Sequence, residues 1–130
     1  CWQAAQEELE AAKVLAQSFP AQSVLLAHNA AEQVLKYALL KMEGLCKSDY
    51  SGEGAHDLPA LLAQLKNPPD ISRQRLKTLS DARVTTRYVK FPPSAEPKLP
   101  SAAYGVNEAD EALNTAAQLV EWARRNLPIA

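Results

Sequence analysis

The chain has few of the residues from which catalytic and metal sites are usually built. Only two histidines and two cysteines occur among its 130 residues, and Cys1 and Cys46 form no CxxC or Cys/His spacing that holds zinc. Two cysteines give no disulfide framework, so a reducing, cytoplasmic location is expected. No GxSxG, HExxH, Walker or GxGxxG pattern is present. We therefore expect no metal, no cofactor and no catalytic residue.

Long apolar runs and period-two alternation are also missing. No run approaches the ~18–20 apolar residues that span a bilayer, and no leader-like segment opens the chain, so no membrane association is expected. The absence of alternation predicts almost no sheet. With 47% hydrophobic and 22% charged residues, the composition is that of an ordinary folded domain. We expect one domain over residues 1–130, and because the chain starts at Cys1 rather than Met, a piece of a longer protein.

What the sequence does contain is helical periodicity, which predicts an all-α, up-and-down bundle of about five helices. Gly44 is expected to end the second helix in a left-handed conformation, Asp57 to cap the third and Asn107 to cap the fifth. The segment 91–105 holds four prolines and is expected to be a long, extended connection before the last helix. The expected helices cover residues 2–18, 20 to about 43, 57–65, 71–84 and 107–125.

The second helix carries apolar residues on two sides. Its main stripe includes Ala27, Ala31 and Val34, but other apolar residues fall outside that stripe. Such a helix needs two neighbours, either a second copy of the chain or an adjacent helix. Trp122 lies off the stripe of the last helix, where it contacts either a partner or a loop. We expect a homodimer whose interface includes Leu25, Leu26, Tyr37, Leu40 and Trp122.

Charge is distributed unevenly although the net charge is only −1. Residues 66–90 carry seven basic and two acidic residues, a net charge of +5. A local excess of this kind binds an anion such as a nucleotide phosphate, whereas the balanced whole argues against a broad duplex-DNA footprint. The alternative is that these residues only solvate a surface helix. The candidate nucleotide-binding residues are Arg73, Arg75, Lys77, Arg83, Arg87 and Lys90.

The remaining polar residues of interest have structural interpretations. His28 lies on an apolar helix face, where a core histidine is expected, and His56 precedes a helix, where a capping or loop hydrogen bond is expected. Glu32 and Lys36 stand four residues apart with the acid first, the spacing of a helix-surface ion pair worth about 0.2–0.5 kcal/mol.

Several segments together resemble the HEPN family, and the resemblance covers nearly the whole chain. They are Trp2, Ala5 and Leu9 in the first helix, "AHNAAEQVLKYALL" (27–40), "HDLPALL" (56–62), "TTRYVKFP" (85–92) and "YGVNEADEALNTAAQLVEWA" (104–123). The resemblance implies a helical bundle that pairs as a homodimer. In some members a site near the dimer cleft holds nucleotides or RNA.

Many HEPN proteins are RNases with an Arg followed after four to six residues by His. No Arg stands at that distance before His28 or His56, so the resemblance points to the non-catalytic branch, similar to the domain appended to sacsin. We expect a dimer that binds a nucleotide such as GTP or ATP, with RNA as a less favoured ligand, within a chaperone-like parent. The alternatives are a purely structural dimerisation module and the HEPN partner of a nucleotidyltransferase in a toxin–antitoxin pair. Arg87 either contacts the ligand or braces the end of its helix.

Overall fold

The computed structural model describes residues 2–45, 56–87 and 105–127, without the side chains of residues 83–87. Within these ranges the chain is helical and has no strand, which confirms the all-α bundle. The helices are α1 (Trp2–Leu15), α2 (Pro20–Ala38) with its π-helical continuation η1 (Leu39–Glu43), α3 (Leu58–Ala63), α4 (Arg73–Arg87) and α6 (Val106–Asn126).

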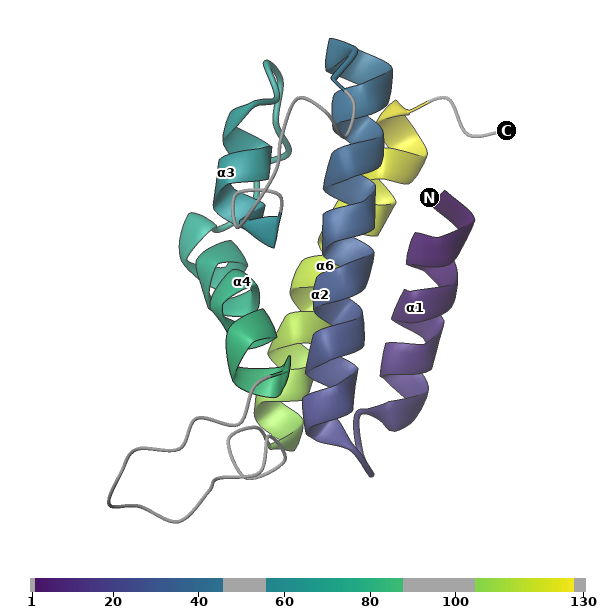
Figure 1. The fold of residues 1–130 in the computed structure, drawn as a ribbon. Helices are drawn as coiled ribbons and strands as arrows, with labels where there is room; N and C mark the ends of the chain where they lie inside the picture. Colours follow the sequence, from purple (N-terminus) through teal and green to yellow (C-terminus); the bar gives the residue numbers. More distant parts are fainter. Residues whose placement is uncertain (1, 46–55, 88–104, 128–130) are drawn as a thin grey trace.

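Helix α2 is the centre of the bundle. Figure 1 shows it between α1 on one side and α3 and α4 on the other, with α6 behind. Its two apolar sides are explained first by these neighbours within the chain. Leu35 and Leu39 are fully buried, and the buried Val24 lies with Leu79 and Ala82 of α4 around one groove. Three sides of α2 are therefore occupied, and one side faces outward.

Small residues let α1 approach α2 closely. Ala5 and Ala12 on α1 and Ala27 and Ala31 on α2 are all fully buried, and a methyl side chain at these positions leaves little between the two backbones. The close approach allows a hydrogen bond in which the buried Ser23 hydroxyl on α2 donates to the Ala12 carbonyl on α1 at 2.6 Å. That bond satisfies a hydroxyl whose burial would otherwise cost free energy.

Leucines fill the opposite side of α2. The short α3 and the longer α4 together bury a group of leucine side chains against it, and the α6 stripe closes the core from behind. Burying a leucine side chain contributes about 1.5–3 kcal/mol, so this group is a main source of stability. Its members on α3 and α4, and on the turn between them, are Leu58, Leu61, Leu62, Leu65, Leu76 and Leu79.

The observed helix ends agree in part with those predicted from the sequence. Gly44 has φ 70° and ends η1, and the Asp57 carboxylate accepts the Ala60 N–H at 3.1 Å as the cap of α3. Helix α6 begins one residue before Asn107, because Gly105 takes the cap position and Glu108 Oε2 accepts the Gly105 N–H at 3.1 Å. The expected cap at Asn107 was therefore wrong.

The bounds of α1 and α4 also differ from expectation. Helix α1 ends at Leu15 rather than Ser18: residues 16–18 form a turn, in which the Phe19 N–H donates to the Leu15 carbonyl at 2.7 Å, and α2 begins at Pro20. Helix α4 spans Arg73–Arg87 rather than 71–84, and the Ser72 hydroxyl accepts the Arg75 N–H at 3.3 Å at its start. The expected Pro-rich connection lies outside the described residues. None of the described helices has the length and apolar character needed to cross a bilayer.

Candidate functional site

Both histidines of the chain belong to one polar cluster beneath α3. Glu32, in the middle of α2, accepts hydrogen bonds from Lys36 Nζ at 3.0 Å and from His56 Nδ1 at 2.8 Å. His28, one turn earlier on α2, is fully buried with its Nδ1 4.0 Å from Glu32 Oε1. Glu8, on α1, lies close enough for the charge of Glu32 to act on its pKa. The cluster thus joins α1, α2 and the residue that leads into α3.

The pKa values of the two carboxyl groups of the cluster are shifted in opposite directions. Burial first, and then the charge of Glu32, raise the pKa of Glu8 above its ordinary value. Burial also acts to raise the pKa of Glu32, but the hydrogen bonds from His56 and Lys36 and their charges outweigh it and lower that pKa. The contacts of Glu32 therefore favour its ionised form, whereas the surroundings of Glu8 disfavour its charge.

Backbone contacts fix His56 in this position. The Leu58 N–H donates to Ser80 Oγ on α4 at 3.1 Å, and Ser80 Oγ in turn donates to the His56 carbonyl at 3.5 Å. Together with the Glu32 bond, these contacts tie the start of α3 to both α2 and α4. Because the His56 side chain is 37% exposed, its ring also meets solvent. The arrangement is a brace that keeps one imidazole edge accessible.

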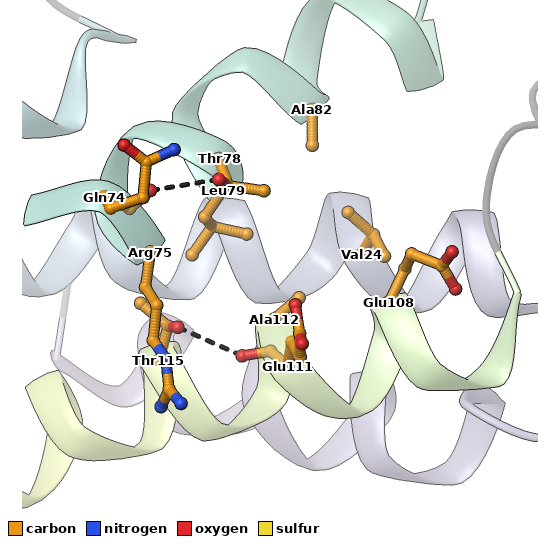
Figure 2. Close-up of a pocket in the computed structure, with 10 residues that line it drawn as sticks. All are labelled: Val24, Gln74, Arg75, Thr78, Leu79, Ala82, Glu108, Glu111, Ala112 and Thr115. Carbon is orange, nitrogen blue, oxygen red and sulfur yellow. Dashed lines mark hydrogen bonds between the residues drawn. The ribbon is translucent and has the colours of Figure 1, made fainter. Parts of the chain in front are cut away.

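A separate groove of about 210 Å³ lies between α2, α4 and α6. Its floor is apolar and is made by Val24, Leu79, Ala82 and Ala112. Figure 2 shows polar side chains around this floor: Gln74, Arg75 and Thr78 from α4, and Glu108, Glu111 and Thr115 from α6. The groove can therefore accept a flat apolar group on its floor and make polar contacts along both walls.

The two walls of the groove carry opposite charge. Arg75 extends from α4 toward α6 (Figure 2), and no ion pair joins it to another of the described side chains. Glu108 and Glu111 stand on the α6 wall. The Thr78 and Thr115 hydroxyls donate to carbonyls of their own helices, at 2.9 Å to Gln74 and 3.0 Å to Glu111. Both hydroxyls still have acceptor capacity for a ligand.

The predicted basic residues do not form one surface. At 100° per residue, Arg73 and Lys77 lie about 160° around α4 from Arg75, so they point away from the groove. Both are exposed, and Lys77 is paired with Asp81 at 2.8 Å. Arg83 and Arg87 belong to α4, but their side chains, like the whole of Lys90, lie outside the described residues. Arg75 is the predicted residue that the structure places at a cavity.

The predicted interface residues lie on α2, η1 and α6 and differ in exposure. Leu25, Leu26 and Tyr37 are half-buried on α2, and the Tyr37 ring lies 6.3 Å from that of Trp2. Leu40 is 45% exposed. Trp122 packs partly buried against the core at the edge of a second groove, which residues 69–71 also line. Leu40 is therefore the most accessible member of the predicted set.

Several residues at these sites were not singled out from the sequence as a group. Glu32, His28 and His56 were interpreted one by one, and Glu108 and Glu111 were not predicted as site residues. The signal available in the sequence is the four-residue spacing of His28 and Glu32, whereas the pairing of Glu32 with His56 spans 24 residues. Among the described residues, no group of His, Cys, Asp or Glu is arranged to hold a metal ion.

Comparisons with known proteins agree with this architecture. The crystal structure of TT1696 from Thermus thermophilus superposes with a TM-score of 0.75, covering 97% of this chain and 94% of that chain at 25% sequence identity. No curated protein matches the sequence. A family model described as HEPN domain matches residues 1–126. Because this match spans nearly the whole sequence, the chain belongs to the HEPN domain family.

Proposed function

We propose that this HEPN domain is a non-catalytic module that binds a nucleotide and associates with a second copy of itself. The absence of catalysis rests on residue order. The RNase motif of the family needs an Arg that precedes a His, yet the first Arg of this chain is Arg73 and the last His is His56. Metal-free RNA cleavage needs a group that moves protons near neutral pH, and the histidine suited to that role is missing from α6.

Nucleotide binding rests on one observation, the position of Arg75 at the edge of an apolar floor. A nucleotide combines a flat base with an anionic phosphate, and a guanidinium binds phosphate through paired, charge-assisted hydrogen bonds. Arg75 has no competing ion pair with any described side chain, in contrast to Lys77. The groove is smaller than the 300–1,000 Å³ typical of drug-sized ligands, so it fits the base and the nearest phosphate rather than a long ligand.

Calorimetric titration with GTP, ATP and a short RNA, each at two salt concentrations, tests this proposal. Arg75→Ala is expected to weaken nucleotide binding by about 1–3 kcal/mol, the size of a lost charge-assisted hydrogen bond. Arg73→Ala is the matched control, because it removes the same charge from the opposite side of α4. If both variants lose the same nucleotide affinity, general electrostatic attraction explains the effect and Arg75 has no specific role. If no nucleotide or RNA binds the wild-type chain, self-association becomes the whole function.

Self-association is proposed through the outward side of α2. This side is not covered by α1, α4 or α6, and at its C-terminal end Leu40 is 45% and Met42 39% exposed. Light scattering is expected to give twice the 14.2 kDa chain mass. Leu40→Glu is expected to shift the protein to the monomer. The control, Val14→Glu, also changes an exposed apolar residue, 79% exposed on α1, and is expected to leave the mass unchanged. A monomeric wild-type chain at micromolar concentration would contradict the proposal.

The context of the module is also a proposal. A HEPN domain of this kind serves a chaperone-like parent by bringing two chains together where a nucleotide binds. Pairing with a nucleotidyltransferase in a toxin–antitoxin system is the alternative. Co-purification of the chain with a nucleotidyltransferase would favour that alternative, and the presence of a chaperone-like region in the same polypeptide would favour the first.

A further inference from the structure

We infer that Glu108 and Glu111 make the α2–α4–α6 groove selective for a mononucleotide over a continuing nucleic-acid strand. The inference rests on the nucleotide binding proposed above. It concerns the wall of the groove that α6 forms, opposite the basic helix α4.

The register of the helices places the charges in order along the groove. Helices α4 and α6 run in opposite directions along this groove, so that Arg75 lies near Thr115, Ala82 lies opposite Ala112, and Glu108 lies further toward the start of α6 (Figure 2). Seven residues separate Glu108 from Thr115, a distance of about 10 Å along a helix. The groove thus has one cationic end, at Arg75, and an acidic wall that extends from Glu111 to the other end.

This order suits phosphate at the Arg75 end of the groove and opposes a phosphodiester beside the acidic wall. A phosphate at Arg75 leaves the base on the apolar floor, where its N–H groups can donate to the α6 carboxylates. A strand that continued along the groove would bring its next phosphodiester beside Glu108 and Glu111. Both side chains belong to exposed residues, and Glu111 has no ion pair among the described residues to neutralise it. Like charges at this range repel and disfavour the longer ligand.

The chain offers a clean way to remove this charge. Glu108 Oε2 also accepts the Gly105 N–H at 3.1 Å, and a glutamine at this position can accept the same bond. Glu108→Gln with Glu111→Gln therefore neutralises the wall and keeps the start of α6 intact. Asp110→Asn removes one charge from an exposed position of the same helix that does not line the groove, and it serves as the control.

The test measures the affinities of GTP and of a six-nucleotide single-stranded RNA for wild type, the double variant and the control, at low and physiological salt. In the double variant the RNA affinity is expected to rise by about five- to tenfold, most strongly at low salt, while the GTP affinity stays within about threefold. The control is expected to raise the RNA affinity by less than about twofold.

The failures of the two proposals are distinguishable. The selectivity inference is overturned, and nucleotide binding stands, if wild type binds GTP but the double variant has an unchanged RNA affinity. The same holds if the double variant binds both ligands more tightly by the same factor. If Asp110→Asn raises the RNA affinity as much as the double variant does, the change in net charge explains the effect and the inference is also overturned. If neither ligand binds wild type or the double variant, both proposals fall.

Discussion

Neutralising Glu32 is the most informative perturbation of the fold. In Glu32→Gln the side chain keeps its shape but loses the charge that holds Lys36 Nζ at 3.0 Å and His56 Nδ1 at 2.8 Å. Hydrogen bonds to charged groups contribute about 1.5–3 kcal/mol each when well shielded. Solvent reaches the His56 ring, which is 37% exposed, and so weakens its share. The variant also relieves the repulsion of Glu8. We expect a net loss of about 1–2 kcal/mol in the free energy of unfolding at pH 7.

The loss should depend on pH with a defined sign. The folded protein lowers the pKa of Glu32 below its ordinary value, so the ionised carboxylate stabilises the fold at pH values above the unfolded pKa. That stabilisation disappears as the pH falls through the folded pKa. Urea unfolding of wild type and Glu32→Gln should therefore differ most at pH 7, and the two curves should converge toward pH 3.

Glu10→Gln is the matched control for this experiment. Glu10 pairs with Lys13 at 3.0 Å, but its side chain is 71% exposed, so its replacement is expected to change stability by less than about 0.5 kcal/mol. If Glu32→Gln changes stability no more than this control, or if its effect is the same at pH 7 and pH 3, the cluster does not brace the fold as described.

Three further predictions concern single residues. Glu8→Gln is expected to stabilise the fold at neutral pH and to have no effect well below the ordinary pKa of a glutamate, because burial and the charge of Glu32 raise the pKa of Glu8; thermal melts across pH check the sign. Gly44→Ala is expected to cost about 1 kcal/mol through backbone strain alone, since φ is 70° and no described residue other than its chain neighbours has an atom within 4 Å of an added Cβ; an unchanged melting temperature would contradict this. Asp57→Ala is expected to cost about 1 kcal/mol by removing the cap of α3, whereas Asp57→Asn should retain most of the stability in denaturant titrations.

The sequence by itself determined the local architecture. The caps at Gly44 and Asp57 depend on backbone conformation and on side chains within three residues, so their types are visible in the sequence. The buried stripes of α1, α2 and α6 follow from helical periodicity, and these stripes predict the helical bundle. The prediction of the α6 cap was wrong, also for a local reason: Gly105 and Asn107 both suit that position, and the Glu108 contact decided between them.

Only the tertiary structure decided the sites. Helical phase shows that Arg75 and Lys77 lie on different faces of α4, but the packing of α4 on α2 and α6 determines which face borders the groove. Likewise, the spacing of Glu32 and Lys36 predicts their ion pair, whereas the contact with His56 crosses a gap of 24 residues. The spacing also suggests a solvated pair, yet Glu32 is only 9% exposed. Sequence periodicity specifies contacts within a helix, and burial and pairing between helices depend on how the chain returns upon itself.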